Sequence, residues 1–327
     1  MSPLHGHDGA VAAFRDSLDA GTLHHAWLLA GPQGIGKALY AEKAALRVLA
    51  DGQGKLGLPG LDVPDDHPAA RLVAAGSHPD LMRLERLPRE NNPAELARSI
   101  TVDQVRGLSR LFGTTASMSP WRVVIVDSAD DLERGAANAL LKNLEEPPPH
   151  SLFLLVSHAP ERLLPTIRSR CRLLRLSPLE PDAMTSALRE ALPEGSDQEI
   201  AELAAAAPGS PGRALAFQGL DIAALDKAMA ELAREGDPTN ARRSALAQSL
   251  ALKSAQPRYE AFLARAPSLV AAAAKQRSGR ALDDALRTWE RAQALASSAR
   301  GLSLEPESVV FELAGLLASL APAAAAR

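Results

Sequence analysis

The sequence predicts a doubly wound α/β domain with a parallel sheet, followed by domains built from helices alone. Short apolar runs alternate with helical patterns over the first 177 residues, and the strand pattern then ends. Only 3% of the residues are aromatic while alanine is abundant, which favours tightly packed helices over an aromatic-rich sheet sandwich. We therefore expect buried strands between helical layers, with ligands at the carboxyl ends of the strands.

Five apolar runs predict the strands of this sheet. They are bounded by turn or helix signals and lie at 26–30, 81–85, 123–127, 152–157 and 172–176. The segment 51–80 is rich in Gly, Pro and Asp, and it is interpreted as an irregular insertion.

Domain boundaries are predicted near residues 177 and 220. The three predicted domains are 1–177, 178–220 and 221–327. The last of them is expected to pack through two apolar stripes at helical spacing: Ile222, Leu225, Met229 and Leu232, and then Leu282, Leu286 and Trp289.

Charge and cysteine content exclude several classes of protein. The net charge is only −3, so the chain lacks the strong positive field of a protein that grips nucleic acid unaided, and DNA contact should be shared or weak. The single Cys171 excludes a disulfide framework and a cysteine-based zinc site. No leader pattern or membrane-length apolar run is found, so we expect a cytoplasmic protein without membrane contact.

A phosphate-binding loop is predicted directly after the first strand. Gly31, Gly34 and Gly36 allow backbone N–H groups to turn inward around phosphate oxygens, and Lys37 adds a point charge at the start of a helix. Ala38 stands where the full pattern requires the Ser or Thr that ligates Mg²⁺. The residues therefore predict a nucleotide-site ancestry, and leave open whether ATP or ADP occupies the loop.

The second half of such a site is expected at the end of the third strand. Asp127 lies where a carboxylate faces Mg²⁺, but Ser128 follows it in place of the glutamate that activates water. Asp130 is a nearby carboxylate, and we expect its side chain to leave the strand end in a different direction. The losses at 38 and 128 both argue against hydrolysis.

Four longer motifs carry a resemblance to a known family. They are GSHPDL (76–81), ITVDQVRGL (100–108), NALLKNLEEPP (138–148) and ERLLPTIRSRC (161–171). In this order they resemble the bacterial clamp-loader ATPases of the AAA+ superfamily, over most of residues 20–217. The resemblance implies a RecA-like AAA+ domain with a five-stranded parallel sheet, a small helical lid, and an all-α C-terminal collar domain.

The resemblance also implies roles for individual residues. Arg170, in a Ser-Arg-Cys motif, is implied to act as an arginine finger in trans, reaching the ATP of a neighbouring subunit. Such a guanidinium is always charged and forked, which suits oxygens that gain charge during phosphoryl transfer. The alternative is that Arg170 only pairs with a surface carboxylate. Ser157 and Arg213 match a phosphate sensor and a nucleotide-contacting lid arginine, and both are also explained by structural roles.

Other residues near these motifs have simpler interpretations. Arg168 is implied to support the subunit interface, and Cys171 is interpreted as a small buried apolar residue rather than a nucleophile. The charged residues of the NALLKNLEEPP helix are a solvated face by default, with a subunit contact implied by the family: Lys142, Glu145 and Glu146.

The chain departs from the family in the insertion before GSHPDL, where relatives carry the cysteines of a zinc module. His67 and His78 alone lack the ligand count of a tetrahedral site, so no zinc or other metal is expected.

Three functions are compatible with these features. The first is a non-hydrolysing, stator-like subunit of a clamp loader, with no independent ATPase activity. Its implied partners are the gamma/tau-type motor subunits, the delta subunit, the sliding clamp and primer-template DNA. The second is an active motor of the gamma/tau type. The third is a stand-alone AAA+ protein of DNA repair or regulation.

Overall fold

The chain forms two compact units in this computed structural model, which describes residues 2–89, 91–113, 115–302 and 304–321. The units are Met1–Arg213 and Ala214–Arg327. The first unit contains the sheet and also residues 178–213, which follow the sheet. The division into three domains at 177 and 220 stays a prediction.

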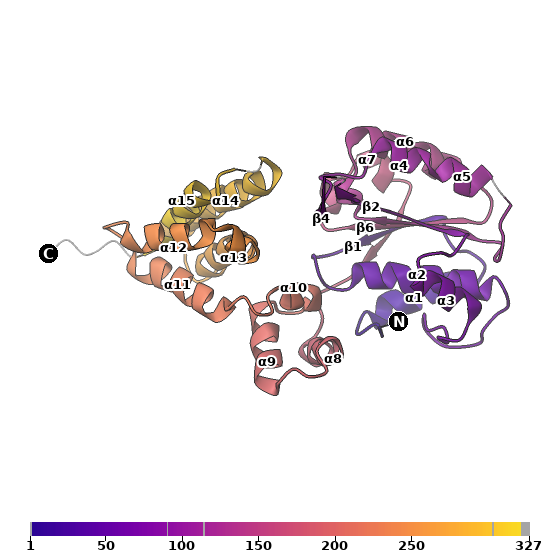
Figure 1. Cartoon of the computed structure of the whole chain (residues 1–327), viewed down its shortest axis with the longest axis horizontal. Coiled ribbons are helices and arrows are strands. Elements are labelled where there is room, and N and C mark those ends of the chain that lie inside the picture. The colour runs from indigo at the N-terminus through magenta and orange to yellow at the C-terminus, as the bar shows by residue number, and fades with distance from the viewer. Residues whose placement is uncertain (1, 90, 114, 303, 322–327) are drawn as a thin grey trace. The chain divides into compact units, whose positions relative to one another are not determined.

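A parallel sheet of five strands forms the centre of the first unit (Figure 1). Its order is β2 (Leu81–Glu85), β5 (Arg122–Asp127), β6 (Ser151–Ser157), β1 (Ala26–Ala30) and β7 (Arg172–Arg175). All neighbouring strands run parallel, so the predicted doubly wound domain with its five strands is confirmed. A separate antiparallel hairpin, β3 (Pro88–Arg89) and β4 (Asn92–Leu96), was not predicted from the sequence.

Helices cover both faces of the sheet (Figure 1). One layer consists of α1 (Asp8–Asp19), α2 (Lys37–Asp51) and α3 (Pro68–Ala74). The other consists of α4 (Val102–Arg106), α5 (Leu108–Gly113), α6 (Arg134–Glu145) and α7 (Pro165–Arg168), with the short turns η1 (Ala129–Asp131) and η2 (Pro160–Arg162) beside them. This arrangement brings the carboxyl ends of the strands to one edge, where the loops carry the candidate site.

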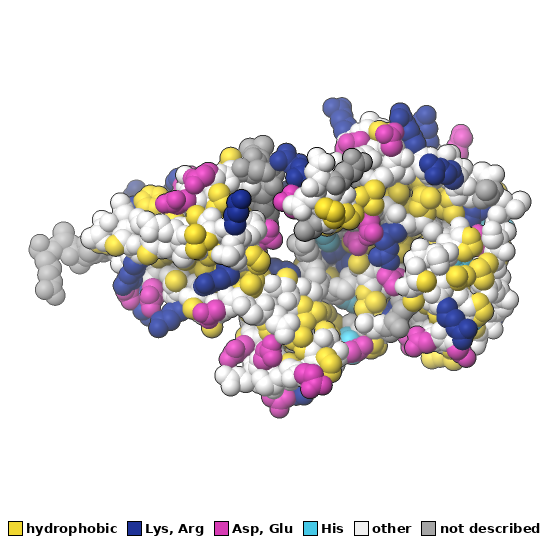
Figure 2. All heavy atoms as spheres, in the orientation of Figure 1, with side chains coloured by type: hydrophobic (Ala, Val, Ile, Leu, Met, Phe, Trp, Pro, Cys, Tyr) yellow, Lys and Arg dark blue, Asp and Glu magenta, His cyan; other side chains and the backbone are white. Residues whose placement is uncertain are grey.

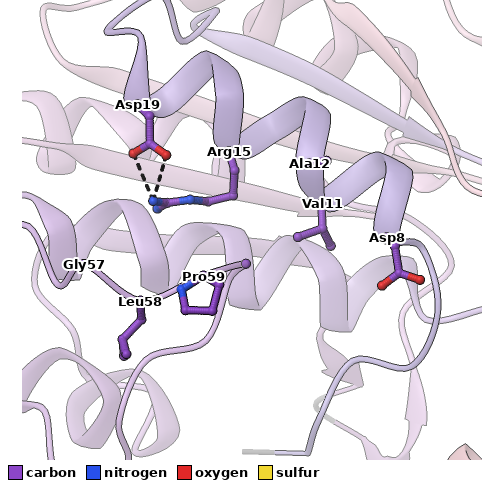
Figure 3. A pocket seen from close by; sticks show the side chains of 9 residues that line it. Asp8, Val11, Ala12, Arg15, Asp19, Gly57, Leu58 and Pro59 are labelled. Carbon is purple, nitrogen blue, oxygen red and sulfur yellow. Dashed lines mark hydrogen bonds and ion pairs between the residues drawn. The ribbon is translucent and has the colours of Figure 1, made fainter.

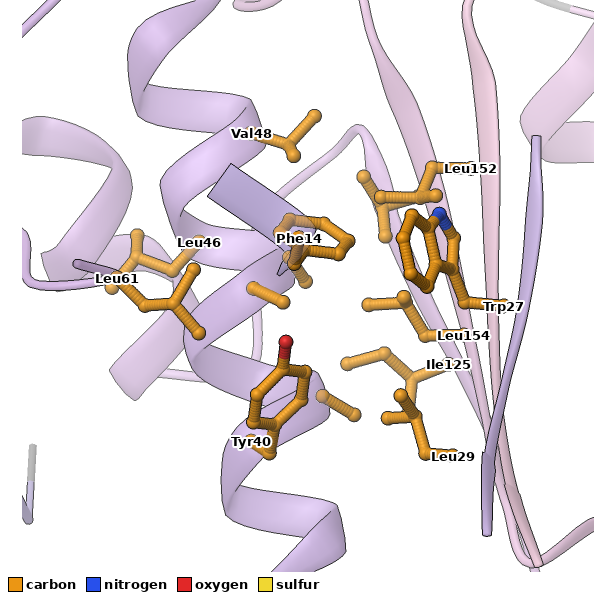
Figure 4. Packing of buried hydrophobic residues seen from close by; sticks show 14 of the residues in the cluster. Phe14, Trp27, Leu29, Tyr40, Leu46, Val48, Leu61, Ile125, Leu152 and Leu154 are labelled. Carbon is orange, nitrogen blue, oxygen red and sulfur yellow. The ribbon is translucent and has the colours of Figure 1, made fainter. Parts of the chain in front are cut away.

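Alternate side chains of strand β1 pack into the two cores on opposite faces of the sheet. Trp27 and Leu29 belong to the core under α1 and α2, whereas Ala26 and Leu28 belong to the core under the other layer. Figure 4 shows the first of these cores, where the ring of Trp27 packs against Phe14 of α1 with centroids 5.2 Å apart. Side chains buried on both faces explain why the central strands β1, β5 and β6 read as continuous apolar runs.

The segment 51–80 is more ordered than predicted, because it contains α3. His67 caps this helix by accepting the N–H of Ala69 at its Nδ1 atom, and Pro68 occupies the first helical position. The helix spans only seven residues, which is too short for apolar periodicity to reveal.

Three helices follow the sheet: α8 (Pro181–Ala191), α9 (Asp197–Ala206) and α10 (Pro211–Ala216). Ser196 caps α9 by accepting the N–H of Glu199 at 3.1 Å, as the capping-box spacing suggests. The loop between α9 and α10 turns back toward the phosphate-loop region of the same unit.

The second unit is entirely helical within the described residues. It contains α11 (Ile222–Glu235), α12 (Ala241–Ala251), η3 (Lys253–Ala255), α13 (Gln256–Ala274), α14 (Gly279–Leu302) and α15 (Pro306–Ala318). The four predicted stripe residues of α11 are buried, as expected. No helix in the described ranges is both long and apolar enough to cross a membrane.

The second predicted stripe, in α14, is wrong at Leu286, whereas Leu282 and Trp289 are half-buried. Leu286 is 43% exposed, and the fully covered face instead carries alanines: Ala285, Ala292, Ala296 and Ala299. Small side chains allow another helix to approach α14 closely, so the buried face is not marked by the largest apolar residues.

Candidate functional site

The phosphate loop lies between the end of β1 and the start of α2, as predicted. Gly34 and Gly36 have φ angles of 80° and 99°, a left-handed region that side chains other than glycine rarely adopt. Lys37 is the first residue of α2 and Ala38 the second, so the missing hydroxyl falls at the helix start where Mg²⁺ would need a ligand.

Lys37 is turned onto its own loop. Its Nζ atom donates hydrogen bonds to the carbonyl oxygens of Gly31 and Pro32 at 2.6 and 2.5 Å, and the residue is only 3% exposed. Burial lowers its pKa to about 8, against the opposing effects of Asp130 and Asp127. The Lys37 ammonium group, which would contact a phosphate in an occupied loop, therefore binds carbonyl oxygens of its own loop.

The loop is also covered from the α9–α10 side. The Ser210 hydroxyl donates to the carbonyl of Gln33 at 2.8 Å, and the Gly212 N–H donates to the carbonyl of Gly34 at 2.8 Å. A Cβ atom at Gly34 would lie 2.7 Å from the backbone nitrogen of Arg213, so the two backbones are in direct contact. The segment 210–213 thus occupies space next to the phosphate loop.

Asp127, whose carboxylate was predicted to face Mg²⁺, is the last residue of β5. Burial raises the pKa of Asp127, partly offset by Arg83, His158 and Lys37. The next residue, Ser128, is buried, and its hydroxyl donates to Asp131 at 2.9 Å. A hydroxyl with this partner supplies no base to a water molecule.

Asp130 is engaged with the end of β6. Its Oδ1 atom accepts hydrogen bonds from the Ser157 hydroxyl at 2.9 Å and the Ala159 N–H at 3.2 Å, while Oδ2 accepts the His158 N–H at 2.6 Å. Ser157 is completely buried. The residue predicted as a phosphate sensor therefore has a structural hydrogen bond to the carboxylate that was considered as a substitute base.

Arg170 lies apart from the loop, in the turn between α7 and β7. Its Nη1 atom donates to the Thr166 carbonyl at 2.9 Å, and its Nη2 atom pairs with Glu145 Oε1 at 2.8 Å. The surface carboxylate of the alternative interpretation thus exists, on α6. One third of the arginine side chain is still exposed, at 33%, so an external anion can reach it.

The neighbouring Cys171 has no feature of a nucleophile. Burial raises the pKa of its thiol to about 12, which keeps it protonated. This agrees with its interpretation as a small apolar residue.

Sequence reasoning missed the residue that organises the insertion. Arg47 of α2 is completely buried, and its guanidinium donates to Asp51 at 2.9 Å and to the carbonyls of Leu58 and Asp62 at 2.8 and 3.0 Å. The only signal was an arginine within the apolar run AALRVLA. A buried charge requires partners, and here the backbone of the insertion supplies them.

The insertion shows no metal cluster. Within the described ranges, no group of three or more His, Cys, Asp or Glu side chains is placed to hold a metal ion. His67 caps α3, and His78 accepts the N–H of Asp80 at its Nδ1 atom.

A cavity of about 620 Å³ lies between α1 and residues 57–60 of the insertion (Figure 3). Arg15 lies in it and pairs with Asp19 at 2.9 Å. No phosphate-loop residue lines this cavity. Figure 2 shows basic and acidic side chains interspersed over the visible faces of both units, without a continuous basic stripe.

Most of the first unit is similar to known proteins. Residues 6–180 match the family described as "DNA polymerase III, delta subunit". The "DNA polymerase III subunit delta'" of Pseudomonas aeruginosa is 41% identical over 200 residues, which cover 61% of this chain and 57% of that protein.

Two Escherichia coli proteins are similar as well. Its "DNA polymerase III subunit delta'" is 41% identical over 150 residues, covering 46% of this chain and 42% of the relative. Its "DNA polymerase III subunit tau" is 31% identical over 229 residues, which cover 68% of this chain and 33% of the tau protein. The chain spans about half the length of the delta-prime relatives it matches.

Proposed function

The chain belongs to the DNA polymerase III delta subunit family, and from this membership we propose that it is the delta-prime subunit of the bacterial clamp loader, acting as a non-hydrolysing stator. Its first unit has the RecA-like AAA+ fold, and the identity to delta-prime relatives exceeds that to the tau relative. In this role the chain joins a heteropentamer and helps load the sliding clamp onto primed DNA during replication, as a component of the DNA-directed DNA polymerase holoenzyme.

The phosphate loop supports the absence of hydrolysis. Ala38 offers no oxygen to Mg²⁺, and the Ser128 hydroxyl, which donates a hydrogen bond to Asp131, is no base for an attacking water. Lys37 is held by the loop carbonyls, and the segment 210–213 lies against the loop. Any ATP or ADP bound here would have to displace these contacts, so we propose weak or absent binding and no turnover.

The surface position of Arg170 is the observation that carries the stator role. Its guanidinium is one third exposed, and it is held by neighbouring elements rather than by the chain's own phosphate loop. It is therefore available to an ATP γ-phosphate on a neighbouring motor subunit. An arginine supplied in trans contributes about 10³- to 10⁵-fold to the rate of comparable phosphoryl transfers.

The proposed partners follow from the family. They are the gamma/tau motor subunits, the delta subunit, and through the assembled complex the sliding clamp and primer-template DNA, in the cytoplasm. We propose that the helical second unit forms the collar that joins the subunits, and that DNA contact is shared, because the net charge of −3 gives no strong positive field.

The alternative function is a gamma/tau-type motor, which the 31% identity to the tau relative brings into consideration. ATP turnover separates the two. The purified chain is assayed alone, then mixed with motor and delta subunits, as wild type, Arg170→Ala and Arg162→Ala. Arg162 is a matched control because it is an exposed arginine of the adjacent turn η2.

The stator predicts no turnover by the isolated chain. In the mixture it predicts stimulated turnover that Arg170→Ala lowers and Arg162→Ala leaves unchanged. Robust Mg²⁺-dependent turnover by the chain alone would identify a motor instead, and an unchanged rate with Arg170→Ala would exclude the arginine finger.

A further inference from the structure

The last turn of α6 contains a carboxylate that the helix itself disfavours. Glu145 is the last residue of α6, where the negative end of the helix dipole repels an acidic side chain. The pair that it makes with Arg170, at 2.8 Å, compensates for this position. From this geometry we propose that Glu145 is a positioning residue, which orients Arg170 toward the nucleotide of a neighbouring subunit. The inference rests on the proposed function.

The backbone around Glu145 is firmly held. Leu144 is buried, and its carbonyl accepts a hydrogen bond from His25 Nε2 at 3.1 Å. Prolines from Pro147 onward end the helix directly afterwards. The carboxylate of Glu145 is thus presented from a fixed point on the edge of the core rather than from a free loop.

Two elements fix the guanidinium together. Glu145 on α6 holds Nη2, while the Thr166 carbonyl on α7 holds Nη1, and Ile167 anchors α7 in the core. Contacts at two different nitrogens, a hydrogen bond and an ion pair, restrict the guanidinium more than either contact would alone. An arginine oriented in advance loses less conformational freedom when it meets a phosphate.

The pair still leaves the guanidinium available. Glu145 Oε1 contacts it at Nη2, and the two side chains are 33% and 47% exposed. An ion pair in water is weak, so it does not compete effectively with the multiple charges of a nucleotide and its metal. Glu145 therefore orients the arginine without withholding it.

The test uses the full chain assembled with motor and delta subunits. Glu145→Gln removes the charge and keeps the shape, and Glu145→Ala removes both. We expect each to lower the kcat of stimulated ATP turnover about 3- to 10-fold at unchanged KM, because the arginine is misoriented rather than absent. Glu145→Asp keeps the charge and should restore part of the rate. Glu161→Ala, at an exposed carboxylate of η2, is the matched control and should have no effect.

A double-mutant cycle separates this role from a structural one. In the Arg170→Ala background, Glu145→Ala should cause no further loss, because the residue acts only through the arginine. A further loss there, or an unchanged or faster rate with Glu145→Ala alone, would overturn the inference while leaving the arginine finger intact. If Arg170→Ala itself changes nothing, the proposed function fails first. Thermal unfolding and assembly by gel filtration confirm that each variant is folded and incorporated.

Discussion

The hydroxyl of Ser210 donates a hydrogen bond of 2.8 Å to the carbonyl of Gln33, joining the segment before α10 to the phosphate loop. These two residues are 177 positions apart in the sequence. With the Gly212 N–H donated to the Gly34 carbonyl, this contact attaches the segment to one side of the loop, while Pro32 and Gln33 stay exposed.

Gly34→Ala is expected to open this contact. The new Cβ would lie 2.6 Å from Ser210 Oγ and 2.7 Å from the Arg213 nitrogen, and the φ of 80° adds a backbone penalty of about 1 kcal/mol or more. Hydrogen exchange at 208–213 should become faster. Gly57→Ala is the control, because its φ is +67° but nothing lies within 4 Å of the new Cβ. Equal protection in both variants would show that the segment does not depend on Gly34.

Restoring the missing hydroxyl should not create an ATPase. Ala38→Ser supplies a ligand for Mg²⁺, but Ser128 still donates to Asp131, and Asp130 is still engaged by the end of β6. We expect no phosphate release by the isolated Ala38→Ser chain above the background of an Asp127→Asn chain. Measurable Mg²⁺-dependent release would mean that a base is present at the site.

Arg47→Met should loosen the insertion without any involvement of a metal. The variant loses the donors to Leu58 and Asp62, and we expect a loss of about 2 to 4 kcal/mol in stability together with faster proteolysis within 51–62. Arg71→Met, at an exposed arginine of α3, is the control. Chelation by EDTA should leave the melting temperature of the wild type unchanged, and a fall on chelation would reveal a bound metal.

The stability contributed by Lys37 should rise with pH. Its pKa is about 8 in the folded chain against 10.5 for an unperturbed lysine, so below about pH 8 both states are protonated and the folded state carries the full cost of burial. As the pH rises toward 10.5, the folded state releases the proton that the unfolded state keeps, and stability increases.

The measurement compares urea unfolding of the wild type and Lys37→Met between pH 7.5 and 9.5. We expect the wild type to gain about 1 to 2 kcal/mol relative to the variant over this range. The exposed Lys142→Met variant should follow the wild type. A constant difference between wild type and Lys37→Met would show that the lysine is not perturbed.

Local patterns predicted the sheet well but failed where small residues form the interface. The central strands β1, β5 and β6 were found because they are buried on both faces and almost wholly apolar, whereas the edge strands β2 and β7 are shorter apolar runs that also carry exposed charged side chains. In α14 the buried face is made of alanines, so the exposed Leu286 misled the assignment. Apolar periodicity identifies the larger side chains, whereas close helix packing selects the smaller ones.

The sequence by itself determined the order of the elements, with a strand, a glycine-rich loop and a helix in succession. It also determined that Ala38 and Ser128 replace the magnesium ligand and the catalytic glutamate, and that an arginine precedes the last strand. Tertiary structure decided the partners of the polar side chains, namely Glu145 for Arg170, Gln33 for Ser210, and the insertion backbone for Arg47. Periodicity reports which face of an element is buried. Which distant atoms then meet depends on how whole elements pack, because hydrogen bonds require positions defined to a few tenths of an ångström.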